Sequence, residues 1–250
     1  MISDSTGPLI AGAVNFRDVG GLPAGRARTR SGVLFRSGSL ARLEPAGVDA
    51  LRVLGVRRVI DLRADEEVVL DPSRVAGLPL QTTRIPLFLG SVASFFEEDR
   101  SLAEMYAALV DESADAIVQV VRGIVEEQPV LVHCTVGKDR TGVSVAVTLA
   151  AAGVDTDAVV ADYARTESLL PSRRNRAVLA YLRARHPDAV HLEDLATRSP
   201  APVMSALLAG LQERYGSAAD YLRAHGLADD EVAELRAVLT HPDVSLNGRR

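Results

Sequence analysis

The stretch PVLVHCTVGKDRTGVSVAV, residues 129–147, holds the one cysteine of this 250-residue chain. Its first five residues form an apolar run typical of a buried strand, and Val143–Val154 form a longer run that predicts a buried helix. Between the two runs lies a short loop with Cys134 at its start and Arg140 at its end. The stretch therefore predicts a strand, a loop and a helix, with the cysteine at the turn.

This loop has the composition of an anion-binding site. Backbone N–H groups of such a turn point inward, and the following helix directs its unpaired N–H groups and positive dipole end to the same place. Gly137 and Gly142 allow close approach because they lack a Cβ atom. Cysteines at helix N-termini near arginine or lysine ionise readily, so we expect Cys134 to be a nucleophile at neutral pH. Arg140 can hold two phosphate oxygens through its planar guanidinium group.

A Walker loop is the first alternative for a glycine- and lysine-containing turn. That pattern requires a glycine, four residues, and then Gly-Lys followed by serine or threonine. Here Gly137 and Lys138 are followed by Asp139, and position 132 is valine. The sequence therefore argues against nucleoside triphosphate binding of that kind.

The remainder of the first half predicts an α/β fold. Helices are expected between the strands, one from Pro45 to a C-terminal cap at Gly55 and one over Asp115–Glu127. Near-continuous apolar strands separated by helices indicate a mostly parallel central sheet flanked by helices on both faces. Short runs bounded by turn residues predict its strands at 33–35, 57–62, 81–85 and 129–133.

The second half predicts helices alone. From Asp155 onward we expect four or five helices and no strand, with Thr156, Ser217 and Asp229 as N-caps. The last residues, 241–250, are expected to form a loose tail. No repeat or linker divides the chain, so residues 1–250 are interpreted as a single domain.

Composition excludes several classes of function. A net charge of −5 and a pI near 5.6 argue against a nucleic-acid partner. A lone cysteine forms no internal disulfide, and neither a signal peptide nor an integral membrane segment is recognised, so a cytoplasmic location is expected, with signal-less secretion left open. His186 and His191 lack zinc-type spacing, and no metal or other cofactor is expected. The sequence does not specify the oligomeric state.

The loop resembles the phosphate-binding loop of cysteine-dependent phosphatases, in the version HC-x-x-GKDR-x-G that is typical of atypical bacterial protein-tyrosine phosphatases with dual or triple (tyrosine, serine and lipid) specificity. The similarity extends to four other segments and covers most of residues 12–240. These segments are NFRDVGGLP at 15–23, GVLFRSGSL at 32–40, VIDLRADEE at 59–67 and YGSAADYLRAHGL at 215–227.

The resemblance implies a phosphomonoester hydrolase that acts on phosphotyrosine, and on phosphoserine, phosphothreonine or phosphoinositides as further candidates. Cys134 would attack phosphorus and form a phosphocysteine, while Arg140 and the loop amides hold the equatorial oxygens. Thr141 would donate a hydrogen bond to the sulfur, and Lys138 would favour highly phosphorylated substrates. His133 would orient the loop backbone. The phosphate-binding loop would comprise His133, Cys134, Thr135, Val136, Gly137, Lys138, Asp139 and Arg140.

The proton donor is less clearly marked. The resemblance favours Asp139, although Lys138 and Arg140 favour its ionised form while a bound phosphate and the thiolate oppose it. Asp61 and Asp65 are the reserve candidates.

Other charged residues have two interpretations. A border of the site or a structural salt bridge would each suit the residues Arg17, Asp18, Arg36, Asp61 and Arg63. Arg173, Arg174 and Arg176 could contact a second phosphate or a membrane headgroup, but a solvated helix face is the favoured interpretation. By resemblance, residues 165–215 could form a helical lid over the catalytic cleft.

Two other functions remain open. A sulfurtransferase would carry a persulfide on Cys134, and a binding module would read phosphate without turnover. The spacing from Cys134 to Arg140 and the GKDR residues favour phosphate chemistry. Arsenate reduction normally needs partner cysteines, which this chain lacks.

Overall fold

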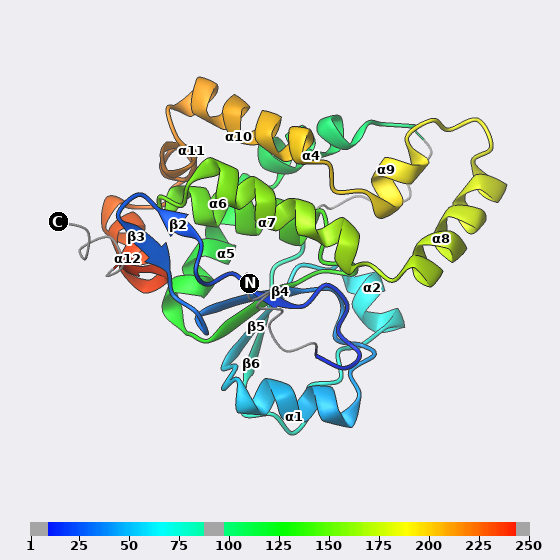
Figure 1. The fold of residues 1–250 in the computed structure, drawn as a ribbon, viewed down its shortest axis with the longest axis horizontal. Coiled ribbons are helices and arrows are strands. Elements are labelled where there is room, and N and C mark those ends of the chain that lie inside the picture. Colours follow the sequence, from blue (N-terminus) through cyan, green and yellow to red (C-terminus); the bar gives the residue numbers. More distant parts are fainter. Residues whose placement is uncertain (1–9, 88–97, 244–250) are drawn as a thin grey trace, which may run out of the picture.

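The computed structural model describes residues 10–87 and 98–243 and is built around a five-stranded sheet (Figure 1). The strand order is β1-β4-β7-β5-β6, in which β4, β7, β5 and β6 are parallel and β1 is antiparallel to β4. The four predicted strands and the mostly parallel sheet are confirmed. The strands are β1 (Arg17–Asp18), β4 (Leu34–Ser37), β5 (Arg58–Asp61), β6 (Gln81–Arg84) and β7 (Val130–His133).

The register of the parallel strands places four chain segments at one edge of the sheet. Ser37 pairs with His133, His133 with Asp61, and Asp61 with Arg84. In an open α/β sheet, ligands bind beyond the carboxyl ends of the strands. The loop that begins at Cys134 after β7 and the segment that leads from β5 into α2 (Asp65–Leu70) therefore meet at this edge.

Helices cover both faces of the sheet because successive strand residues point to opposite sides. Leu34, Ile60 and Val132 pack into the larger core, whereas Phe35 and Val59 pack into the smaller one. The smaller core is closed by α1 (Pro45–Val53), whose C-cap is Leu54 and not the predicted Gly55; Gly55 follows the cap with a φ of +66°. On the other face lie α4 (Leu102–Glu112), α5 (Ala114–Glu126) and α6 (Arg140–Ala151), which include the two buried helices that the sequence predicts (Figure 1).

The described part of the second half contains six helices rather than four or five. Among the predicted N-caps Ser217 is confirmed, since its hydroxyl accepts the Asp220 N–H at 3.0 Å. Thr156 and Asp229 are instead the first residues of their helices. The six are α7 (Thr156–Leu169), α8 (Ser172–Arg185), α9 (Leu192–Thr197), α10 (Ala201–Tyr215), α11 (Ala218–Ala224) and α12 (Asp229–Leu239).

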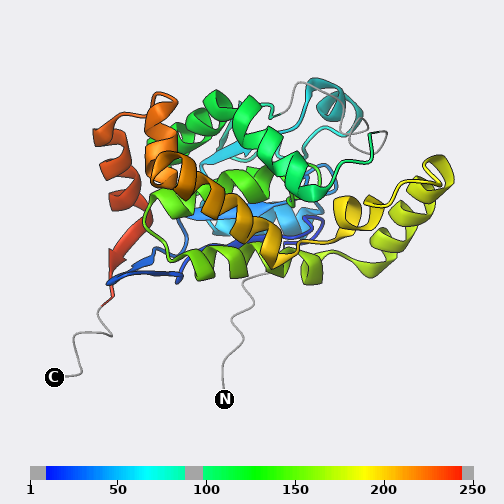
Figure 2. The same cartoon turned by 90° about the horizontal axis from the view of Figure 1, so that it is seen from above.

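Two of these helices extend from the remainder of the molecule. In both views α8 and α9, drawn in yellow-green and yellow, form an arm beside the carboxyl edge of the sheet (Figure 2). They pack on each other through Leu182, Leu192 and Ala196. Nowhere in the described ranges is a helix both long enough and apolar enough to cross a membrane.

A small second sheet corrects two predictions about the C-terminus. Its strands are β2 (Pro23–Ala24), β3 (Ala27–Thr29) and β8 (Thr240–Pro242), so a strand does follow Asp155. The expected tail is also wrong at its start, because His241 pairs with Arg28 and Asp243 forms a salt bridge with Arg28 at 2.5 Å. The remainder of that predicted tail, 244–250, lies outside the described residues.

Candidate active site

The loop from Cys134 to Arg140 connects β7 to α6 in a tight turn that requires a glycine. Gly137 has a φ of +73°, and a Cβ atom there would lie 2.3 Å from the Ser37 carbonyl oxygen. Only glycine adopts this conformation without strain and avoids that clash. The turn lets α6 begin at Arg140 directly beside the cysteine.

The loop carbonyls are held from outside the loop. Ser39 N–H donates to the Thr135 carbonyl at 3.0 Å, and the Asn15 amide donates to the Gly137 carbonyl at 2.8 Å and to that of Val136 at 3.3 Å. A peptide unit is planar, so each bound carbonyl turns the next residue's N–H to the opposite side. One such N–H, that of Gly137, donates to Cys134 Sγ at 3.3 Å. The Gly137 amide therefore faces the sulfur, and the bound carbonyls face away from it.

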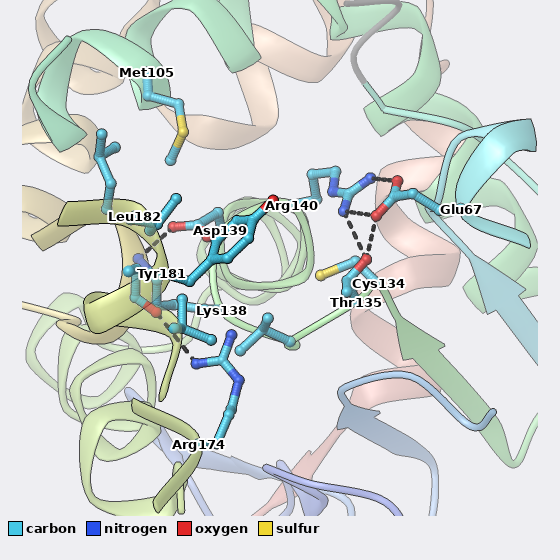
Figure 3. Close-up of a pocket in the computed structure, with 14 residues that line it drawn as sticks. Glu67, Met105, Cys134, Thr135, Lys138, Asp139, Arg140, Arg174, Tyr181 and Leu182 are labelled. Carbon is cyan, nitrogen blue, oxygen red and sulfur yellow. Dashed lines mark hydrogen bonds and ion pairs between the residues drawn. The ribbon is translucent and has the colours of Figure 1, made fainter. Parts of the chain in front are cut away.

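The Arg140 guanidinium lies across the loop and is held by Glu67 from α2 (Figure 3). Its two terminal nitrogens donate to the Glu67 carboxylate at 2.5 and 2.8 Å, and one of them also donates to the Thr135 hydroxyl at 3.1 Å. Thr135 in turn donates to Glu67. Burial raises the pKa of Glu67, but the Arg140 hydrogen bonds and charge outweigh it and lower that pKa to about 2. Burial likewise opposes the charge of Arg140, yet Glu67 holds the pKa of Arg140 above its ordinary value.

A buried ion cluster supports the loop from behind. Arg17 donates to Asp162 of α7 at 2.7 Å, and Arg36 donates to the same carboxylate at 2.8 Å and to the Gly137 carbonyl at 3.0 Å. Burial and the neighbouring Arg36 lower the pKa of Arg17 to about 10. Burial raises the pKa of Asp162, but the two arginines lower it further, so the net direction is downward. Arg17 and Arg36 are therefore structural supports of the loop and do not border the cavity.

The other candidate border residues also lie outside the cavity. Asp61 and Arg63 pair with each other at 2.7 Å, and both are buried. Burial raises the pKa of Asp61, but the Arg63 hydrogen bond lowers it below its usual range. Asp18 accepts the N–H groups of Gly20 and Gly32, which closes a turn. Of the two interpretations of Asp18, Asp61 and Arg63, these contacts favour the structural one, because each residue is paired with a neighbour and none lines the cavity at Cys134.

The two reserve proton donors have partners away from the cavity. Asp61 faces His133 at 3.6 Å behind the strand ends, and Asp65 forms an exposed salt bridge with Arg84 at 2.6 Å. Burial holds the pKa of His133 below its usual value despite Asp61, and its Nδ1 lies 3.1 Å from the Cys134 carbonyl, as expected of a residue that orients the loop. Neither Asp61 nor Asp65 lines the cavity at Cys134.

Asp139 does line that cavity, and a polar network holds it. Its Oδ1 atom accepts from Lys138 Nζ at 2.7 Å and from the Tyr106 hydroxyl at 2.9 Å. The Tyr106 hydroxyl lies 2.8 Å from that of Tyr163. Lys138 is only 1% exposed and also donates to the Asp194 carbonyl of α9 at 3.2 Å. The lysine therefore connects the loop to the helical arm.

Thr141 does not make the contact with the sulfur that the family resemblance implies. Its hydroxyl is buried and makes no hydrogen bond within the described ranges, so none reaches Cys134. The packing is close at this point, since a Cβ atom on the next residue, Gly142, would lie 3.2 Å from the Tyr163 ring.

The cavity has a volume of about 360 Å³ and brings the loop together with the helical arm (Figure 3). Cys134 lies at its base and is only 3% exposed. Arg174 is half-buried in the cavity wall and not on a solvated face, whereas Arg173 and Arg176 are exposed as predicted. The lining side chains include Glu67, Met105, Lys138, Asp139, Arg140, Arg174, Tyr181 and Leu182.

Several residues that line the cavity or hold the loop in place were not predicted as site residues. Glu67 satisfies the helix-start pattern of α2, where its carboxylate accepts the Ala64 N–H at 2.9 Å, and this local role hides its contact with Arg140. Tyr106 and Tyr163 lie on buried helix faces typical of core. Asn15 has a φ of +59°, which is uncommon outside glycine, but a sequence does not show φ.

A buried cysteine at the base of an amide-lined loop, beside an arginine at the start of a helix, defines the class of cysteine-dependent phosphatases. The tyrosine phosphatase family matches residues 8–241. The chain belongs to this family, and it is a phosphoric monoester hydrolase of the protein-tyrosine phosphatase type.

Two curated relatives match most of the chain. It is 32% identical to the triple specificity protein phosphatase PtpB of Mycobacterium tuberculosis over 92% of this chain and 98% of that protein. It is 32% identical to a tyrosine-protein phosphatase of Nostoc commune over 87% of this chain and 78% of that protein. Among solved structures, the catalytic domain of the PP-IP phosphatase SIW14 from S. cerevisiae matches with 12% identity and a TM-score of 0.40, covering 63% of this chain and 78% of that one.

Proposed function

We propose that this phosphatase removes phosphate from phosphotyrosine through a phosphocysteine at Cys134, with Asp139 as the proton donor. The observation that carries the proposal is the position of Cys134 Sγ, which accepts the Gly137 N–H at 3.3 Å in the same cavity wall as Arg140. A thiolate stabilised by such a donor and a nearby guanidinium attacks phosphorus without an added base.

In the first step, a bond forms between Cys134 Sγ and phosphorus while the bond from phosphorus to the ester oxygen breaks. The inward-facing loop amides and Arg140 hold the three equatorial oxygens. Glu67 and Thr135 already engage the terminal nitrogens of Arg140, so its Nε, which donates to none of the described residues, is the donor left for a phosphate oxygen. The leaving oxygen takes its proton from Asp139, which lines the same cavity.

In the second step, a water oxygen attacks phosphorus and the sulfur leaves. Asp139, now ionised, accepts the proton of that water, so the enzyme returns to its starting state and releases inorganic phosphate. A departing thiolate needs stabilisation, and the Gly137 N–H at 3.3 Å supplies it. Thr141 would assist only after a change of its rotamer, because its buried hydroxyl makes no hydrogen bond among the described residues.

The substrate range of the proposal extends beyond phosphotyrosine. The Mycobacterium tuberculosis relative is named a triple specificity phosphatase, which supports phosphoserine, phosphothreonine and phosphoinositides as further substrates here. The cavity adds Arg174 as a cation beside Lys138 and Arg140. Lys138 donates to the Asp139 carboxylate and to the Asp194 carbonyl, whereas Arg174 donates only to the uncharged Asn175 side chain and the Ala196 carbonyl, so Arg174 is the better placed of the two to attract a second phosphate.

We also propose that the arm formed by α8 and α9, within residues 165–215, acts as a lid. Arg174, Tyr181 and Leu182 of α8 and Ala196 of α9 line the cavity above Cys134. A lid excludes water during the reaction and limits access of oxidants to the sulfur.

A panel of phosphotyrosine, phosphoserine and phosphothreonine peptides and phosphoinositides, tested on the wild type and on Cys134→Ser, tests the proposal. We expect turnover of the phosphotyrosine peptides by the wild type and none by Cys134→Ser. If no member of the panel is turned over although phosphate binds, the chain is a binding module. If Cys134→Ser retains full turnover, the nucleophile is wrong. A thiosulfate-to-cyanide assay separates out a sulfurtransferase, for which we expect no activity.

A further inference from the structure

The network around Asp139 determines where its proton can lie. Oδ1 receives two donors, Lys138 Nζ at 2.7 Å and the Tyr106 hydroxyl at 2.9 Å. Its other oxygen, Oδ2, accepts no hydrogen bond from the described residues. The two carboxylate oxygens, which are equivalent in a free aspartate, therefore have different surroundings here.

Of the two donors at Oδ1, the lysine cannot reverse its role, and the tyrosine could do so only by turning its proton to Tyr163. A lysine ammonium carries donors only. While Tyr106 donates its one hydroxyl proton to Asp139, Tyr163 is the donor and the Tyr106 oxygen the acceptor in the 2.8 Å contact between the two tyrosine hydroxyls. A proton on Oδ1 would face the Lys138 ammonium, which cannot accept it, and would require Tyr106 to give up its hydrogen bond to Asp139.

We infer that Tyr106 is a positioning residue that, together with Lys138, directs the transferable proton of Asp139 onto Oδ2. The inference deepens the proposed function and rests on the assignment of Asp139 as the proton donor. Oδ1 is held toward α4 and Lys138, which leaves Oδ2 as the oxygen able to exchange a proton with a substrate bound at Cys134. Tyr106 itself does not line the cavity and acts through Asp139 alone.

The position of Tyr106 is itself fixed. Its side chain is fully buried on α4, and its ring meets that of Tyr163 edge to face with centroids 6.0 Å apart. Burial first, and then the nearby Asp139, raise the pKa of Tyr106 well above its usual value, so the hydroxyl keeps its proton. Tyr163 follows Asp162 on α7. The Asp162 carboxylate accepts a hydrogen bond from Arg36, and Arg36 also donates to the Gly137 carbonyl. One turn of α7 thus supports both the loop and the proton donor.

The test compares the hydrolysis of phenyl phosphate, whose leaving group needs a proton, with that of p-nitrophenyl phosphate, whose leaving group does not. In Tyr106→Phe we expect the ratio of kcat/KM for p-nitrophenyl phosphate to that for phenyl phosphate to rise about tenfold, the effect of losing one hydrogen bond to a charged group. We also expect the falling limb of the pH profile for phenyl phosphate to move to higher pH, because the ionised carboxylate has lost a donor.

Tyr221→Phe is the matched control. Tyr221 is equally buried, and its hydroxyl donates at 2.7 Å to the Val110 carbonyl of the same helix, α4, but it has no contact with Asp139. Its removal should leave the ratio of the two substrates and the pH profile at wild-type values. An equal rise in Tyr221→Phe would mean that loosening of α4 explains the effect, and this would overturn the inference.

Asp139→Asn separates a failure of the inference from a failure of the proposed function. If Asp139→Asn raises the ratio and Tyr106→Phe does not, only the inference is overturned. If Asp139→Asn leaves the ratio unchanged in an active enzyme, the proton donor is wrong and the inference fails with it. Should Tyr106→Phe not fold, Tyr163→Phe is the second variant, because it removes the donor to Tyr106. We expect it to raise the ratio of kcat/KM for the two substrates about threefold. An unchanged ratio would contradict the inference.

Discussion

The ion pair between Glu67 and Arg140 makes a quantitative prediction about stability. The folded-state pKa of Glu67 is about 2, against 4.5 for an unperturbed glutamate. A difference of about 2.5 pKa units corresponds to about 3.5 kcal/mol, at about 1.4 kcal/mol per unit. The Glu67 side chain is 28% exposed, and solvent screening reduces this value, so we expect Glu67→Gln to lose about 1–3 kcal/mol of the free energy of unfolding at pH 7.

The sign of its pH dependence follows from the lowered pKa. A carboxylate that is a stronger acid in the folded state stabilises the fold above its unfolded pKa and loses that contribution as the pH falls toward the folded value. The contribution should be complete at pH 7 and about half lost at pH 3.5. Urea denaturation of the wild type and of Glu67→Gln should therefore give curves whose separation narrows steadily below about pH 5.

Asp65→Asn supplies the control for this experiment. Asp65 lies in the same first turn of α2, but its side chain is 76% exposed and its pair with Arg84 lies at the surface. Such pairs contribute about 0–1 kcal/mol. A separation between the wild type and Glu67→Gln that stays constant from pH 7 to pH 3.5, or a Glu67→Gln as stable as the wild type at pH 7, would refute the reasoning.

Three further predictions follow from the site. Asp139→Asn should slow phenyl phosphate hydrolysis far more than p-nitrophenyl phosphate hydrolysis in steady-state assays, and equal slowing would exclude Asp139 as the acid. Asp162→Ala should cost about 3–5 kcal/mol in thermal or urea unfolding, because it leaves Arg17 and Arg36 buried without their carboxylate; a loss below about 1 kcal/mol would show that water replaces Asp162. Leu182→Asp should detach α8 from α9 and speed peroxide inactivation of Cys134, and an unchanged rate would argue against the lid.

The sequence predicted the strands and helices that show a recognisable apolar pattern or are bounded by turn residues. The strands at 34–37, 58–61, 81–84 and 130–133 are apolar or bounded by breakers, and their order with the helices leads directly to a parallel sheet. The strands of two or three residues, β1, β2, β3 and β8, were missed because so short a segment carries no periodicity. They are specified by pairing partners far away in the chain, as His241 is by Arg28.

The site residues also fall into two groups, those that a local pattern predicts and those that distant contacts bring to the loop. The residues from His133 to Arg140 are contiguous, so their chemistry could be predicted from composition and spacing. Glu67 and Tyr106 reach the loop from 73 and 33 residues away, and each also satisfies a local pattern of its own, a helix cap and a core face. Arg17 and Arg63 were ambiguous because a charged residue near a strand end suits a site or a salt bridge equally; burial against Asp162 and Asp61 decides for the latter.

Chemical trapping of the covalent intermediate tests the central claim of this account most directly. Wild type and Asp139→Asn would be mixed with p-nitrophenyl phosphate, denatured within milliseconds and mapped by mass spectrometry. We predict phosphate on Cys134, at higher occupancy in Asp139→Asn because that variant lacks the base for the second step, and none in Cys134→Ser. Turnover with phosphate on another side chain, or with Cys134 never modified, would contradict the account.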